Sequence, residues 1–255
     1  MYCTVKNTKS QFYILACRGN LAIIKRMIYI RIMKNESRLS ILKNCILATA
    51  GLMLFGFATY LMIQADIGVE PWSCFALGLS KKLGILYGNA SIIISCVVIA
   101  MDLILKEKIG FGTILDAIVV GKTVDLLNWL DLIQKSNSIP LSIVMMLLAF
   151  FVAALSQFLY MKAELCCGPR DAFQVALGKR MPKIPIGVVN IFILSTVFIL
   201  AWLLDGPIGI CTIVAPIGLG LMQQLVFTMM HFDPKALSHQ SIIGSFKVLL
   251  KKTSN

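Results

Sequence analysis

Charged residues are scarce in this sequence and are absent from long stretches of it. They make up 14% of the 255 residues, whereas hydrophobic residues make up 58%, a balance outside the range of soluble globular domains. Five runs contain no charged residue and no histidine: 44–65, 83–101, 136–161, 184–204 and 206–230. Each has about the ~20 residues that a helix needs to cross ~30 Å of hydrocarbon. A soluble core does not explain five such runs.

These runs predict membrane-spanning helices, and a sixth segment joins them. Residues 109–130 are apolar apart from Asp116, Lys122 and Asp125. A helix satisfies its own backbone N–H and C=O groups, as the inside of a bilayer requires. We therefore predict an all-α fold, a polytopic transmembrane helical bundle of six spans, with the lipid bilayer as its first partner.

Residues that carry catalysis or hold cofactors are scarce as well. The sequence has two histidines, His231 and His239, both near the C-terminus. It contains no Walker motif, no metal-ligand spacing and no Ser/His/Asp arrangement. We therefore expect neither an enzyme nor a bound metal or cofactor, and no direct coupling to ATP.

The net charge of +12 comes from 24 Lys and Arg against 12 Asp and Glu. No basic stripe is interleaved with aromatic residues, so we expect no nucleic-acid partner. With six spans and a cytoplasmic N-terminus, 20 of the Lys and Arg lie on the cytoplasmic side and 3 on the outer side, while Lys122 lies within a span. Because cytoplasmic loops carry the excess of positive residues, we expect a cytoplasmic-membrane protein with both termini inside.

The two ends of the chain differ from the part between them. Residues 1–43 form a basic N-terminal extension, interpreted either as a disordered arm, as a surface-lying helix, or as sequence upstream of a true start at Met33. Residues 231–255 form a basic tail in which apolar residues recur at helical spacing after Pro234. Such a pattern is typical of an amphipathic helix that anchors at a membrane surface.

The part between the ends contains an internal repeat. At an offset of 98 residues Pro71 matches Pro169, and at an offset of 99 the glycines and threonines match in pairs: Gly88 with Gly187, Gly110 with Gly209, Thr113 with Thr212, and Gly121 with Gly220. Each unit, 44–130 or 136–230, predicts one span, a short Pro-headed helix and two further spans. Three crossings is an odd number, so the second unit enters the membrane upside down, as in many secondary transporters. The two Pro-headed helices are then expected to face opposite sides.

The Pro-headed segments differ in charge. Pro71 is followed by Trp72, whereas Gly168 and Pro169 are followed by Arg170 and Asp171. Proline suits the first position of a helix, and an aspartate there complements the helix dipole. A free helix N-terminus with a guanidinium group predicts an anion site. The alternative is an ion pair or a lipid-headgroup contact at Arg170.

The third span of each unit carries the other polar residues of interest. Asp116 and Asp125 lie at membrane depth, where charges are usually paired or face a cavity. Lys122 and Asp125 are three residues apart and can pair on one helix face. Gln224 is the repeat partner of Asp125, and both residues are interpreted either as interhelical contacts or as lining of a pathway. Gly112 with Thr113, and Gly209 with Thr212, mark the starts of these spans as structural positions.

The motifs of both units resemble those of a known family. The second unit contains "CGPRDAFQVAL" and "WLLDGPIGICTI", and the first contains "GVEPWSCFALGLS" and "GFGTI". Over about residues 44–230 the chain is similar to the YczE/YyaS/YitT group of bacterial integral membrane proteins. Ser73 stands where that group favours Asp. The resemblance implies a multi-pass bacterial membrane protein and names no substrate.

Two functions remain open from the sequence. The first is a transporter or permease for an unidentified small solute, among which an anion is one possibility, with substrate-binding residues Arg170, Asp171, Asp116, Asp125 and Gln224. The second is a non-transporting membrane protein that supports or regulates a membrane-associated partner. The inverted repeat favours transport, whereas the scarcity of polar groups in most spans favours the second function.

Overall fold

The computed structural model describes residues 38–107, 111–163, 168–181, 184 and 186–231. The chain forms two units, Met1–Leu42 with Phe246–Asn255, and Lys43–Ser245. The expected N-terminal extension, apart from its last residues, and the expected amphipathic tail after His231 lie outside the described residues. The unit Lys43–Ser245 carries the candidate site.

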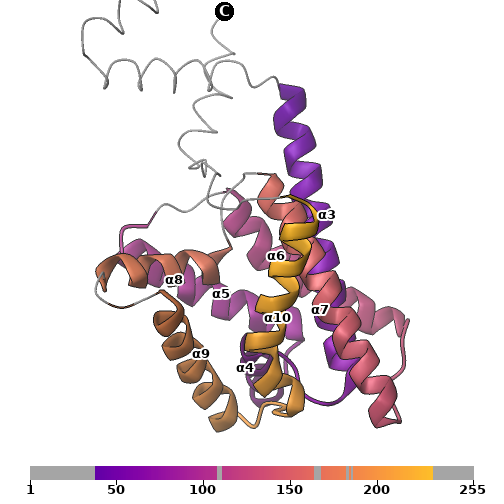
Figure 1. Ribbon diagram of the computed structural model, residues 1–255. Coiled ribbons are helices and arrows are strands. Elements are labelled where there is room, and N and C mark those ends of the chain that lie inside the picture. The colour runs from indigo at the N-terminus through magenta and orange to yellow at the C-terminus, as the bar shows by residue number, and fades with distance from the viewer. Residues whose placement is uncertain (1–37, 108–110, 164–167, 182–183, 185, 232–255) are drawn as a thin grey trace, which may run out of the picture. The chain divides into compact units, whose positions relative to one another are not determined.

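Every regular element in the described part of the chain is a helix, as the sequence predicts (Figure 1). The helices are α3 (Arg38–Ala65), α4 (Pro71–Leu83), α5 (Tyr87–Ile104), α6 (Phe111–Leu130), α7 (Ile139–Lys162), α8 (Pro169–Arg180), α9 (Ile186–Leu203) and α10 (Ile210–Met229). Short helices α4 and α8 begin at the two prolines, where the missing N–H costs no hydrogen bond.

Four of the described helices are long and apolar enough to cross a membrane: α3 from Lys43, α5, α7 and α10. The expected span over 184–204 is α9, whose apolar stretch Val188–Leu203 is shorter. The expected span over 109–130 is α6, which has 20 residues and contains three charged side chains. Large apolar side chains on α10, such as Ile213, Ile217 and Leu221, are more than 60% exposed. Such apolar helices imply a lipid bilayer around the protein.

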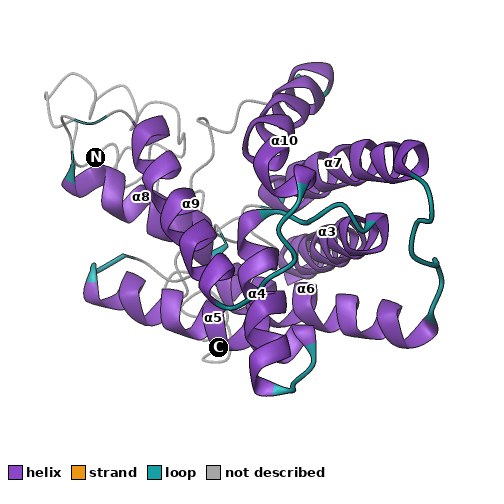
Figure 2. Cartoon of the chain, turned by 90° about the horizontal axis from the view of Figure 1, so that it is seen from below, coloured by secondary structure: helices purple, strands orange, loops and turns teal. Residues whose placement is uncertain are grey.

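Each short helix packs against helices from both halves of the chain. Helix α4 packs on α9 and α5, and α8 packs on α5 and α9. Helix α7 packs along α10 and α5 along α6, and the view from below shows α7 beside α10 (Figure 2). The two prolines therefore begin two short helices that both pack on α5 and α9.

Glycines allow the closest helix contacts near the site. A Cβ on Gly88 of α5 would lie 2.6 Å from the Gly121 carbonyl oxygen of α6. A Cβ on Gly56 of α3 would lie 2.7 Å from the side chain of Thr123 on α6. Larger residues cannot fit there without moving a helix. Helix α6 is thereby held against both α3 and α5.

The loop before α4 is fixed to the start of α10. The Cys211 N–H donates to the Ile67 carbonyl at 2.9 Å, and Gly68 has a φ of +92°, a backbone conformation that favours glycine. The Gly209 N–H donates to the Thr212 hydroxyl oxygen at 3.1 Å and so satisfies a donor at the helix start. Gly209 and Thr212 thus lie at the start of α10.

Candidate functional site

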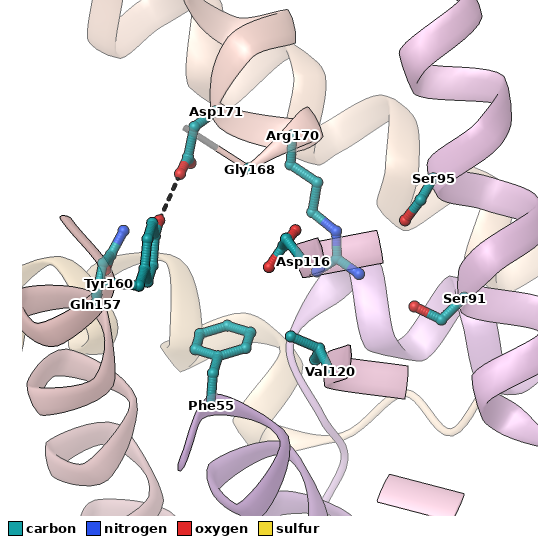
Figure 3. Close-up of a pocket in the computed structure, with 10 residues that line it drawn as sticks. All are labelled: Phe55, Ser91, Ser95, Asp116, Val120, Gln157, Tyr160, Gly168, Arg170 and Asp171. Carbon is teal, nitrogen blue, oxygen red and sulfur yellow. Dashed lines mark hydrogen bonds between the residues drawn. The ribbon is translucent and has the colours of Figure 1, made fainter. Parts of the chain in front are cut away.

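A cavity with both charged and apolar lining residues lies at the start of α8, among helices of both halves of the chain (Figure 3). Its volume is about 80 Å³. Three of the residues lining it are charged and the others are hydroxyl, amide, aromatic or small residues. The lining consists of Phe55, Ser91, Ser95, Asp116, Val120, Gln157, Tyr160, Gly168, Arg170 and Asp171.

Arg170 joins the two Pro-headed helices. Its Nη1 atom donates to Oε1 of Glu70, the residue just before Pro71, at 2.9 Å. The side chains are 21% and 11% exposed, so the pair is mostly shielded. The guanidinium carbon also lies 5.2 Å from the ring centre of Trp72, within the range of a cation–π contact. The ion pair that the sequence left as an alternative for Arg170 is present, and its partner, Glu70, comes from the first half of the chain.

Glu70 accepts a further hydrogen bond from a buried side chain of α4. The Ser73 hydroxyl donates to the same Oε1 atom at 2.9 Å. Ser73 Oγ also lies 3.1 Å from the Tyr87 hydroxyl, which begins α5. Ser73 and Tyr87 are both buried. The carboxylate is therefore fixed by α4 and, through Ser73, linked to α5.

Asp171 lies in the first turn of α8 and contacts α7. The Tyr160 hydroxyl donates to its Oδ2 atom at 2.8 Å, the hydrogen bond drawn in Figure 3. A carboxylate at this position also complements the positive end of the α8 dipole. Asp171 thus ties the start of α8 to the wall of the cavity.

Asp116 of α6 lies beside Arg170 in the cavity (Figure 3). A Cβ on Gly168 would lie 2.9 Å from its Oδ2 atom, so glycine at 168 lets the backbone before α8 approach this carboxylate. No hydrogen bond from the described residues reaches the Asp116 carboxylate, which distinguishes it from the other two acids. The structure therefore brings Arg170, Asp171 and Asp116 together.

Asp125 and Gln224 lie elsewhere. Asp125 Oδ1 accepts the Gly88 N–H at 2.8 Å, at the start of α5. The predicted pairing with Lys122 is confirmed, with Nζ 3.7 Å from Oδ2. Gln224 is exposed on α10 and lines a separate groove with Leu221, Leu225, Thr228 and Met229. Neither residue lines the cavity at Arg170.

The structural residues expected from the sequence occupy helix starts. Pro71 and Pro169 are first in their helices, and Trp72 covers the Arg170 guanidinium. Gly112 and Thr113 are buried at the start of α6. Their burial agrees with a packing role.

Sequence reasoning missed Glu70, Tyr87 and Tyr160. Glu70 carried a readable signal, because it is the acidic residue in "GVEPW" and directly precedes the repeated proline. Glu70 was not among the predicted site residues because the prediction rested on the residues that follow each proline. The tyrosines carry no local signal, since Tyr160 lies 11 residues before Asp171 and Tyr87 lies 14 residues after Ser73.

Helices of this length and composition, with a charged cavity between them, define a polytopic α-helical membrane protein. The chain belongs to DUF6198, a family of unknown function whose profile matches residues 42–228. The matched residues nearly coincide with the part of the chain, about 44–230, whose motifs carry the resemblance stated from the sequence.

Bacterial relatives agree with this assignment. The chain is 27% identical over 175 residues to the uncharacterized membrane protein YczE of Bacillus subtilis, covering 68% of this chain and 80% of YczE. It is 26% identical over 168 residues to YyaS of the same species, covering 64% and 82%. An uncharacterized protein of Haemophilus influenzae is 25% identical over 173 residues, covering 68% and 78%. No solved structure matches the chain.

Proposed function

We propose that the protein is a carrier for a small solute, rather than an enzyme, and that the cavity at Arg170 is its solute site. The observation that carries the proposal is a cavity with three charged side chains, enclosed by apolar helices. Charges at membrane depth are costly and usually serve a pathway or a binding site. Here they also come from both halves of the chain, where carriers place their sites.

The inverted repeat is part of this proposal. The helices of the two halves follow the same order of lengths, with 28, 13, 18 and 20 residues against 24, 12, 18 and 20. Lys106 and Asp205, which the offset of 99 pairs, both have positive φ, +56° and +53°. The reciprocal packing of α4 on α9 and α8 on α5 adds to this support. A carrier can then open alternately by moving one half against the other.

The proposal includes six spans, with α6 and α9 crossing beside the four longer apolar helices, and both termini in the cytoplasm. The loop charges support this orientation. Cysteines introduced at Ser138, before α7, and at Lys162, at its end, test it with a membrane-impermeant thiol reagent on intact cells. Labelling of residue 138 alone agrees with the proposal, and labelling of residue 162 alone contradicts it.

Uptake into proteoliposomes tests the carrier function. The full chain is reconstituted and offered a mixture of small amines, amino acids, organic acids and sugars, and the contents are identified by mass spectrometry. Ser91→Met places a longer side chain in the cavity and is expected to abolish uptake. Val97→Met on the exposed face of the same helix is the matched control and is expected to keep it. Uptake of no solute above protein-free liposomes would favour the partner-supporting function.

A further inference from the structure

We propose that the solute of this cavity is a small organic cation with N–H donors, such as a protonated primary amine, and that Asp116 is its counter-ion. The inference rests on the carrier function proposed above and names its class of substrate. It differs from the anion that a helix N-terminus and a guanidinium group favour in the sequence.

The positive charge at the site is already matched. Arg170 is the one basic residue that lines the cavity among the described residues, and its guanidinium group donates to Glu70 at 2.9 Å. The Trp72 ring covers the same guanidinium group. An anion would have to compete with a fixed carboxylate for Arg170, so the ion pair argues against an anionic solute.

Carboxyl groups outnumber basic groups at the site. Glu70, Asp116 and Asp171 place three carboxyl groups around one guanidinium group. Asp171 is held by the Tyr160 hydroxyl. Asp116 receives no hydrogen bond from the described residues, although it lies beside the cavity. It is therefore the carboxyl group of the site with neither oxygen in a hydrogen bond to the described residues, and it offers a ligand both of its oxygens as acceptors.

The rest of the wall suits an ammonium group. Ser91 and Ser95 point their hydroxyl oxygens toward the cavity from α5 (Figure 3), and these oxygens can accept N–H hydrogen bonds. The Phe55 ring lies on the opposite side from them, and aromatic faces attract cations. A cavity of about 80 Å³ limits the ligand to a small molecule.

Thermal unfolding of the purified full-length protein in detergent tests the proposal. Methylammonium and ethylammonium chloride are titrated at constant ionic strength against sodium chloride, with tetramethylammonium chloride as a cation that has no N–H donor. We expect the primary ammonium ions to raise Tm and tetramethylammonium to have a weaker effect. Equal stabilisation by sodium and by all the organic cations would overturn the proposal, because it would show a general salt effect.

Variants at Asp116 test whether the ammonium ions bind at this carboxyl group. Asp116→Asn keeps the shape of the side chain and is expected to weaken methylammonium binding at least tenfold. Asp205→Asn, at an exposed carboxylate outside the cavity, is the matched control and should bind as the original protein does. If Asp116→Asn does not fold, Asp116→Ala, which also removes the carboxyl group, replaces it. Unchanged binding in the Asp116 variants would refute the role of Asp116.

The outcomes separate this inference from the carrier function. Stabilisation by acetate or phosphate instead of amines, lost in Arg170→Gln, would overturn the cationic class and leave a solute carrier. No uptake of any solute in the proteoliposome assay, together with no stabilisation by any ion, would overturn both.

Discussion

Helices α4 and α8 begin with nearly the same backbone and with opposite chemistry. The residues before their prolines, Glu70 and Gly168, have φ and ψ of −59° and 152°, and of −59° and 162°. The first helix carries its charge before the proline, as Glu70, and the second carries Arg170 directly after it. The two charges meet at 2.9 Å. A shared backbone geometry thus holds two complementary side chains.

This difference explains why each helix tolerates its own charge. A carboxylate before the first turn is favourable at the positive end of a helix dipole, whereas a guanidinium group there is not. Glu70 offsets that cost for Arg170, and Trp72 adds an aromatic face. In the proposed duplication, divergence at two positions therefore turned two similar helix starts into an interlocking pair.

The largest expected effect comes from breaking the pair on one side. Arg170→Gln or Glu70→Gln leaves a mostly shielded charge without its partner, which typically costs about 3 kcal/mol or more. The double variant Glu70→Gln/Arg170→Gln removes both charges and is expected to unfold closer to the original protein than either single variant. Chemical denaturation in detergent measures these free energies of unfolding.

A double variant whose loss equals the sum of the two single losses would contradict this view. The two charges would then be energetically independent, and the geometric contact between α4 and α8 would not stabilise the fold. Lys179→Gln, which removes an exposed ion pair of α8, is the control for a charge change on the same helix.

Two tyrosines from neighbouring helices form hydrogen bonds with residues at the starts of α4 and α8, and their variants sharpen the comparison. Tyr87→Phe removes a hydroxyl group from the buried link with Ser73, and Tyr160→Phe removes the donor to Asp171. A buried polar group that loses its partner costs about 1–3 kcal/mol. We expect the larger loss for Tyr87→Phe, because Ser73 and Tyr87 are both buried, whereas Tyr160 is half-buried.

Denaturation midpoints of the two variants, measured side by side, test this order. Tyr60→Phe is a useful reference, since the Tyr60 hydroxyl bonds to the backbone of Ile133, and neither residue lines the cavity. A larger loss for Tyr160→Phe than for Tyr87→Phe would reverse the order and place the more stabilising network on α8.

Much of the fold follows from local patterns in the sequence, and the site follows from them only in part. Charge-free runs predict α3, α5, α7 and α10 because crossing a bilayer demands about the same length of apolar helix each time. Proline fixes the starts of α4 and α8 for a local reason. The Glu70–Arg170 pair spans 100 residues, and no local pattern encodes which distant side chains tertiary packing brings together.

Gln224 illustrates the same limit from the other direction. Its repeat partner Asp125 is 11% exposed and bonded to Gly88, whereas Gln224 lies on an exposed face of α10. Aligning the two halves of the sequence predicts which positions along two helices correspond. It does not predict which helix packs beside each position, because α6 packs along α5 whereas α10 packs along α7.

The smallest expected effects come from the far ends of α4 and α8, where each helix forms an exposed ion pair. Lys82 pairs with Asp205 at 2.9 Å, and Lys179 pairs with Glu107 at 2.8 Å. Glu107 is the less exposed acid, so Glu107→Gln is expected to lower Tm more than Asp205→Asn. Raising the salt concentration should reduce the loss of Tm in both variants, because salt screens the ion pairs of the original protein.

Acid should affect the ion pair at the end of α4. The hydrogen bond and the positive charge of Lys82 lower the pKa of Asp205 below its ordinary value of 3.8. A lowered pKa in the folded state means that the pair stabilises the fold above 3.8 and loses this contribution as the pH falls through the folded-state pKa. The Tm difference between the original protein and Asp205→Asn should therefore be constant near neutral pH and vanish in strong acid. A difference that grew as the pH fell would show that Asp205 is stabilised in its protonated form instead, and that the end of α4 does not rely on Lys82.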